Sequence, residues 1–245
     1  MKGFTKTSGL TLLGFILMLG ACLTSPAQQN RDRNTKKVSE AAKQSAKAAR
    51  VFDEIMGTRE KSIPQDLLDK AEAVAVFPSV FKAGFIVGGR GGSGVISRRV
   101  AGGWGAPTFF DLGGGSVGLQ IGASSTDYIL LFMNENAVES LLSDKFEIGG
   151  EGSAAAGPVG RSASASTDVK LNAQILSYSR SRGAFAGLEL KGVVIKPDNE
   201  DNLQVYGMNA RDILTGANKI SMDKMPEGVR VFPETLARYS IRKRN

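Results

Sequence analysis

The stretch LGGGSVGLQIGASSTDYILLF, Leu112–Phe132, carries two patterns that predict different structures. From Val117 to Ala123, apolar residues alternate with glycine and glutamine, which is the period of a β-strand. A dinucleotide-binding loop functions only where a helix begins within it, because the helix N-terminus faces the pyrophosphate. The sequence therefore predicts strands and no nucleotide site, although the G-x-G-x-x-G spacing of such a loop occurs at Gly113, Gly115 and Gly118 and again at Gly89, Gly91 and Gly94.

Glycine is unusually frequent in this chain. There are 30 glycines in 245 residues, well above the usual share of about 7%, and most lie between Gly84 and Gly192. Glycine inside a strand marks a bend or a face that another backbone approaches closely, and twisted sheets use it to turn corners. We therefore expect strongly bent strands.

Strands are predicted in the middle of the chain. Tyr128–Met133 is continuously apolar, as a central strand would be. Later strands are expected over Val169–Tyr178 and Leu188–Lys196. Trp104, Phe109 and Phe110 could enter a bilayer or pack in the core, and the core is the favoured interpretation because large aromatic side chains are usually buried.

Helices are predicted toward both ends. From Thr35 to Met56, small and apolar residues recur at three- and four-residue steps, as in an amphipathic helix that Gly57 can end. Shorter helices are expected from Pro64, after an Asn134 cap, over Ala210–Leu214 and over Pro233–Tyr239. Strands clustered between helices, without β-α alternation, predict an α+β fold with a mainly antiparallel, glycine-rich twisted sheet or partly closed barrel.

The N-terminus predicts export and a lipid anchor. Lys2 and Lys6 precede an apolar run, Leu10–Leu19, that is too short to span a bilayer and has the form of a secretory signal. The residues LGAC, ending at Cys22, resemble a bacterial lipobox, and Cys22 is the one cysteine of the chain. The predicted organisation is a lipoprotein signal over 1–21, a flexible tether over 22–34 and a single domain over 35–245. Leu23 is not the aspartate that resembles an inner-membrane retention signal, so the periplasmic side of the outer membrane is the expected location; the alternative is an ordinary signal peptide.

Composition argues against an enzyme. The chain has no histidine, which excludes Ser-His-Asp and Cys-His catalysis and histidine metal sites. The acidic residues of the sheet region show no paired motif. The segment PDNEDN, Pro197–Asn202, lacks the glycine and terminal glutamate of an EF-hand loop and is expected to be a polar hairpin turn. We expect no cofactor, no metal and, for an exported protein, no nucleic-acid partner.

The formal net charge is +7, and basic residues accompany the predicted strands. If they converge on one face, they form an anion-binding surface for lipid head groups; the alternative is an ordinary solvated surface. The candidates from this region are Lys82, Arg90, Arg98, Arg99, Arg161, Arg180 and Arg182.

Several motifs taken together resemble the SYLF domain, a lipid-binding module. They are KAGFIVGGRGGSGVISRR, GGWGAPTFFDLGGGSVGLQIGASSTDYILLF, GPVGRSASASTD, ILSYSRSRGAFAGLELKG and VYG, and the resemblance extends from about Ala41 to Thr215. It implies a non-enzymatic module. Relatives in eukaryotes bind phosphoinositides, partly through a basic amphipathic N-terminal segment, and some also bind actin.

Carried over by position, that basic segment matches Thr35–Met56, with Lys36, Lys37, Lys43, Lys47 and Arg50 as implied head-group contacts. Actin is not an expected partner in a periplasmic compartment. The prediction is a membrane-anchored lipoprotein whose domain binds anionic phospholipid. The alternative is a structural or protein-interaction lipoprotein of the cell envelope without lipid specificity.

Overall fold

The structure is a computed structural model, and it describes residues 26–58, 62–150, 152–160, 173–181, 184–188, 190–216 and 220–240. Cys22, the predicted signal segment, Arg161 and Arg182 lie outside these residues. So does the first part of the strand expected over Val169–Tyr178.

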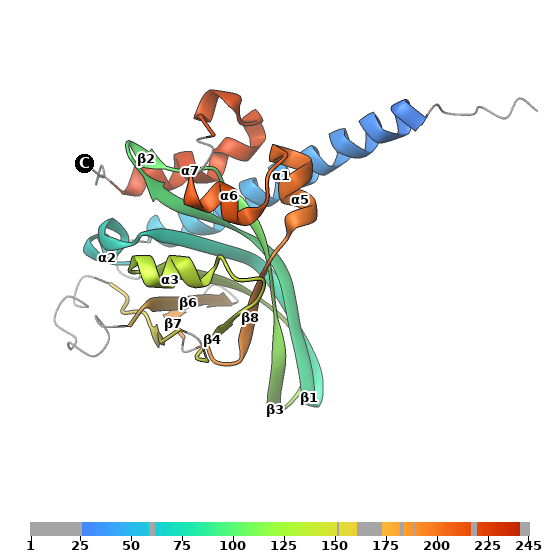
Figure 1. Ribbon diagram of the computed structural model, residues 1–245. Coiled ribbons are helices and arrows are strands. Elements are labelled where there is room, and N and C mark those ends of the chain that lie inside the picture. The colour runs from blue at the N-terminus through green and yellow to red at the C-terminus, as the bar shows by residue number, and fades with distance from the viewer. Residues whose placement is uncertain are drawn as a thin grey trace, which may run out of the picture.

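A long two-stranded ribbon forms the centre of the fold. Strands β1 (Ala73–Val100) and β3 (Thr108–Phe132) pair antiparallel from Ala73 opposite Phe132 to Ile96 opposite Thr108. The short strand β2 (Gly103–Trp104) closes the hairpin against the end of β1. Near its middle the ribbon bends sharply, so that its two halves face each other (Figure 1). The predicted bent strands are thus present.

Glycine allows the two halves of β1 to touch. A Cβ atom on Gly94 would lie 2.4 Å from a ring carbon of Phe77 and 2.5 Å from the carbonyl oxygen of Val76. One on Gly92 would lie 3.0 Å from the Cα atom of Val80. Farther along, the Arg99 N–H donates to the Glu72 carbonyl at 2.8 Å, which links the end of β1 to its beginning. The sheet is consequently a nearly closed barrel, and the G-x-G-x-x-G glycines lie in its strands.

The other strands extend this ribbon. Strand β3 pairs with β6 near its end and with β8 near its start, both antiparallel. Strand β4 joins β8, β7 joins β6, and β5 joins β6 in parallel. Their bounds are β4 (Phe146–Ile148), β5 (Ala154–Ala156), β6 (Ile175–Ser181), β7 (Ala184–Gly187) and β8 (Val193–Pro197).

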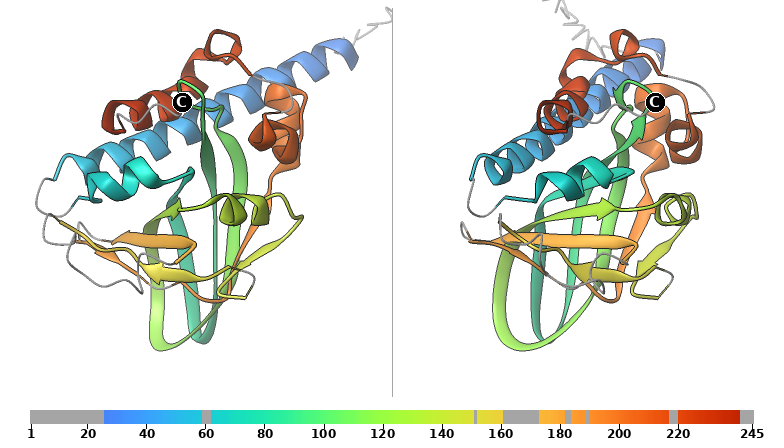
Figure 2. Two further views of the ribbon diagram at one scale, coloured as in Figure 1. Left: turned by 60° about the vertical axis from the view of Figure 1, so that its left-hand side comes forward. Right: turned by 90° about the vertical axis from the view of Figure 1, so that its left-hand side faces the viewer.

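Helices lie at both ends of the chain, as predicted, and these terminal helices gather on one side of the sheet in Figure 2, whereas the short helix α3 lies apart from them beside the strands. The Asn134 side chain caps α3 by accepting the Ala137 N–H at 2.9 Å. The bounds are α1 (Pro26–Met56), α2 (Gln65–Lys70), α3 (Glu135–Ser140), α5 (Asn199–Tyr206), α6 (Ala210–Thr215), the 3₁₀ helix η2 (Met222–Lys224) and α7 (Glu227–Tyr239).

Four local expectations differ from the structure. The strand expected over Leu188–Lys196 begins only at Val193, and the helix expected over Pro233–Tyr239 begins at Glu227. Helix α1 begins at Pro26 rather than Thr35, so most of the expected tether continues the helix; proline suits a first helical turn because its φ is already fixed. The segment PDNEDN is the start of α5 and not a hairpin turn. The Asp198 side chain accepts the Asp201 N–H at 3.0 Å, and this N-cap uses the same residue types that favour turns.

Both faces of the ribbon carry buried apolar residues. Alternate residues point inward to one apolar cluster, as Phe77, Phe110 and Leu130 do, while their neighbours point outward beneath α1, α2 and α7. Trp104 and Phe109 belong to the outer cluster and Phe110 to the inner one, each at most 4% exposed. The prediction that these aromatic residues form core is confirmed.

Helices α1 and α7 pack closely and run in the same direction. Gly228 lies over Ala42, where an added Cβ would be 2.7 Å from the alanine methyl. The buried Ser45 hydroxyl donates to the Val229 carbonyl at 2.7 Å. At the far end, the Tyr239 hydroxyl donates to the Asp53 carboxylate at 2.6 Å. The first and last helices of the chain therefore lie side by side in one layer.

The contact between the halves of β1 gives a test of whether the glycines of the G-x-G-x-x-G spacing serve packing. Gly94→Ala should lower the free energy of unfolding by about 1–3 kcal/mol, because the methyl overpacks a closed site. Gly89→Ala should change it by less than about 0.5 kcal/mol, since nothing lies within 4 Å of its added Cβ. Urea unfolding measures both. Equal losses would contradict the packing explanation.

Candidate functional site

A row of four cations runs along the exposed side of α1. Lys36, Lys43, Lys47 and Arg50 follow at steps of seven, four and three residues, which keeps them on one face of the helix. All four side chains are exposed, whereas the opposite face packs Ala41, Ala48, Phe52 and neighbouring residues into the core. We call these four residues the basic stripe.

The charges of the basic stripe are not neutralised by neighbouring side chains that the structure describes. None of its four side chains forms an ion pair or hydrogen bond with any residue that the structure describes. Glu40 is an exposed carboxylate on the same side of α1. Four positive charges with one carboxylate among them leave a net positive face, so this side of α1 attracts anions.

A groove of about 530 Å³ opens at the C-terminal end of the basic stripe. Helix α1 forms one wall, and the segments of β1 and β3 at Ser79 and Asp127, together with β6, form the other. Lys47 and Arg50 belong to both the stripe and the groove. The lining residues are Lys47, Arg50, Val51, Glu54, Pro78, Ser79, Ser125, Asp127 and Arg180.

Arg180 connects the two walls. Its guanidinium donates to Asp127 at 2.9 Å and also pairs with Glu54 of α1. Burial lowers the pKa of Arg180, but the hydrogen bonds that it donates to both carboxylates outweigh that effect and the pKa is raised. Two carboxylates thus compensate the charge of Arg180. The uncompensated charge of the groove belongs to Lys47 and Arg50.

Asp127 also holds a β-bulge in β1. Its second oxygen accepts the Ser79 N–H at 2.8 Å, and Ser79 has a φ of 53°, which few non-glycine residues adopt. The register of β1 against β3 shifts between Phe77 and Val80. Ion pairing at Arg180 therefore fixes α1, β3, β6 and the bulge together, which gives the groove a defined shape.

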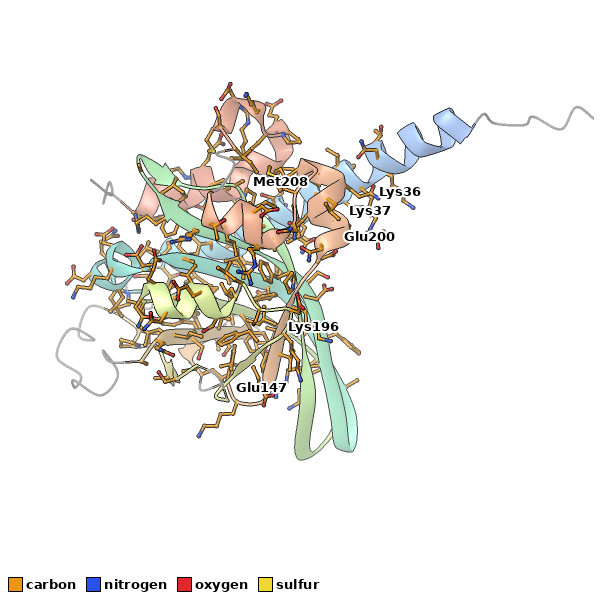
Figure 3. The ribbon with its side chains drawn as sticks, viewed as in Figure 1. Lys36, Lys37, Glu147, Lys196, Glu200 and Met208 are labelled. Atoms are coloured by element: carbon orange, nitrogen blue, oxygen red, sulfur yellow. The ribbon has the colours of Figure 1, made fainter. Side chains whose placement is uncertain are left out.

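Lys37 is adjacent in sequence to the stripe but has a different role. Its ammonium lies 2.7 Å from Asp201 and 3.6 Å from Glu200 of α5. The hydrogen bond to Asp201 raises the pKa of Lys37. In Figure 3, Lys37 and Glu200 lie close together, with Lys36 farther out along α1. Lys37 therefore joins α1 to α5.

Two arginines of β1 hold helices in place. Arg98 donates to the Leu214 carbonyl of α6 at 2.8 Å and pairs with Glu135 of α3. Arg99 is 1% exposed, and its guanidinium lies 4.1 Å from the centre of the Trp104 ring. It donates to the carbonyls of Leu68 and Ala71, both at 3.0 Å, and to the Ser240 hydroxyl at 2.8 Å. Arg99 cannot contact a surface ligand in this structure.

The remaining candidates are spread over the molecule. Lys82 is exposed on β1, and Arg90 is half-buried on the same strand beyond the bend. The groove itself was not predicted, because Glu54, Asp127 and Ser79 come from segments far apart in sequence. Pro78 next to Ser79 was the available signal, since proline within a strand pattern indicates an edge or a bulge.

Two kinds of feature are absent from the residues that the structure describes. No helix there is long and apolar enough to cross a membrane. No cluster of three or more acidic or cysteine side chains in that part of the chain could hold a metal ion. The open charged groove and stripe are the features with evident chemistry.

The folded ribbon is covered by terminal helices and has a cationic exposed side. Residues 113–239, just over half of the chain, match the model of the Ysc84 family, described as "Las17-binding protein actin regulator". The chain belongs to this family, which confirms the SYLF resemblance. The family is one of binding and regulatory domains.

Named relatives extend the similarity toward the N-terminus. The rat SH3 domain-containing YSC84-like protein 1 is 36% identical over 181 residues, 71% of this chain and 53% of the relative. From Saccharomyces cerevisiae, LAS seventeen-binding protein 3 is 34% identical over 200 residues, 79% of this chain and 42% of the relative, and Protein YSC84 is 33% identical over 204 residues, 81% and 42%. The chain thus spans about half the length of these relatives or less.

The buried position of Arg99 predicts a structural role. Arg99→Gln should lower the free energy of unfolding by about 3 kcal/mol, because buried carbonyls would lose their donor. Arg50→Gln is the matched control, with an expected change below about 0.5 kcal/mol at an exposed position. Trp104, the single tryptophan, reports unfolding by fluorescence in urea. An Arg99→Gln protein as stable as the control would refute this role.

Proposed function

We propose that this protein is a membrane-anchored lipoprotein whose domain binds anionic phospholipid head groups through the basic stripe, without catalysis. One observation carries the proposal: four exposed cations on one face of α1 have no partner among the described residues. A phospholipid surface supplies the missing negative charge over the same length. Between Lys36 and Arg50, a helix rises about 21 Å at 1.5 Å per residue.

The energy of such a contact is adequate. Each basic residue near an anionic membrane contributes about 1 kcal/mol. Four such residues give about 4 kcal/mol, or between two and three orders of magnitude in binding. The attraction acts within a Debye length of about 10 Å at 0.1 M salt, so it requires the exposed side of α1 to lie close to the surface.

The anchor and the stripe are compatible in this proposal. Cys22, the proposed site of acylation, precedes the first residue of α1 by only four positions. The N-terminal turns of α1 extend beyond the rest of the fold (Figure 1). An acylated Cys22 would bring this helix to the bilayer, where the stripe could engage head groups. The proposed location is the periplasmic side of the outer membrane.

Protein binding is the second candidate. The family description and the name of the yeast relative LAS seventeen-binding protein 3 refer to binding of Las17. By analogy, this chain would engage a protein of the cell envelope. Recovery of one stoichiometric protein with the anchored form, unaffected by lipid composition, would favour this candidate; actin is not proposed.

Vesicle co-sedimentation tests the lipid proposal. The chain from residue 22 with Cys22→Ser, which removes the acylation site, should bind phosphatidylglycerol vesicles and not neutral ones. Changing the four stripe residues to glutamine should weaken binding by nearly three orders of magnitude at about 0.1 M salt, because about 1 kcal/mol is lost per residue. Rising salt concentration should likewise weaken vesicle binding by the chain with an intact stripe.

The matched control removes equal charge elsewhere. Lys70, Lys145, Lys196 and Lys224 are exposed and lie outside α1. Their simultaneous change to glutamine lowers the net charge by the same amount and should leave most of the binding intact. Equal losses in the two variants would mean that net charge, and not the stripe, attracts the vesicle. Absence of vesicle binding would reject the lipid proposal.

A further inference from the structure

A large aromatic side chain is exposed beside the groove. Phe81 is 54% exposed, whereas the other phenylalanine side chains that the structure describes are buried or half-buried. The next residue, Lys82, is also exposed. A single exposed phenylalanine is ordinary at a protein surface, so the inference rests on its position beside the cations and not on its exposure alone.

The position of Phe81 follows from the bulge. Val80 is 1% exposed and packs in the inner cluster, so strand alternation turns Phe81 to the outer side of the ribbon. There α1 no longer covers the sheet. Phe81 stands opposite Ser125 in the register of β1 and β3 and follows Ser79 by two residues. Ser79 and Ser125 both line the groove.

The groove therefore has cations on one wall and an apolar side chain at its rim. Lys47 and Arg50 line the groove from α1. Phe81 lies beside the opposite wall, where it pairs with the lining residue Ser125. This combination matches the interface of an anionic bilayer, where phosphate groups lie just outside the acyl chains and aromatic side chains are favoured at the boundary. A protein partner with a purely acidic surface could pair with the cations, but it would offer no apolar contact to Phe81.

We propose that Phe81 inserts into the interfacial region of an anionic bilayer when the basic stripe binds head groups. The inference rests on the proposed lipid binding and adds a second, apolar contact to it. The two contacts differ in their response to salt. Screening shortens the reach of the stripe from about 10 Å at 0.1 M to about 3 Å at 1 M salt, while burial of a phenyl ring is not screened.

The first test compares Phe81→Ser with Leu203→Ser in the chain from residue 22 with Cys22→Ser. Leu203 is 53% exposed but belongs to α5, so it matches Phe81 in exposure and not in position. On phosphatidylglycerol vesicles, Phe81→Ser should bind about five- to tenfold more weakly at every salt concentration, as expected for losing the burial of half a phenyl side chain. Leu203→Ser should bind as the parent does.

The second test detects insertion directly. Phe81→Trp places a fluorophore at the groove, and vesicles with brominated acyl chains quench tryptophan that enters the bilayer. Strong quenching is expected in this variant. The parent protein should show little, because Trp104 is 4% exposed and packed in the core.

The outcomes separate the two proposals. If the parent binds anionic vesicles while Phe81→Ser binds equally well and the introduced tryptophan is not quenched, insertion is wrong and head-group binding stands. Equal losses for Phe81→Ser and Leu203→Ser would also overturn the specific role of Phe81. If Phe81→Ser binds vesicles normally but loses an envelope protein, Phe81 belongs to that protein interface and insertion is wrong. If the parent binds no vesicles, both proposals fail.

Discussion

Contact between the two halves of β1 is the constraint on which the rest of the structure depends. A strand of 28 residues can fold back on itself only where its side chains leave room, and Gly92 and Gly94 provide that room against Val80 and Phe77. The bend gives the ribbon an enclosed inner face and an outer face. Covering that outer face requires the helical layer. The groove forms where α1 passes the bulge on the same outer side.

The sequence could predict local structure because local structure depends on period and on caps. The alternation from Val117 to Ala123 indicated a strand, and Asn134 indicated a helix cap; both are present. Three-dimensional closure could not be derived in this way. Which glycines meet another backbone depends on contacts such as Gly94 with Phe77, between positions well separated in the chain. The start of α5 was missed because Asp198 is equally suited to a turn and to an N-cap.

The basic side chains show the same limit of prediction from sequence. Lys36 and Lys37 are neighbours and identical in chemistry, yet one is exposed and the other is paired with Asp201. Arg98 and Arg99 are neighbours as well, and only Arg99 is almost fully buried. Once the fold is known, strand alternation and helical pitch explain these differences. Spacing in the sequence could not identify which carboxylates and carbonyls accept hydrogen bonds from Lys37, Arg98 and Arg99.

The parallel packing of α1 and α7 has a consequence for how the chain folds. The hydrogen bond between Ser45 and Val229 spans 184 positions in sequence, and both helices cover the same apolar face of the ribbon. Part of that apolar cluster stays exposed until α7 has been synthesised. Contacts of such long range slow folding, because a large loop must close before any stabilisation is gained. The domain therefore completes its core only after α7 has been made. A nascent chain that lacks α7 would expose apolar side chains that promote aggregation.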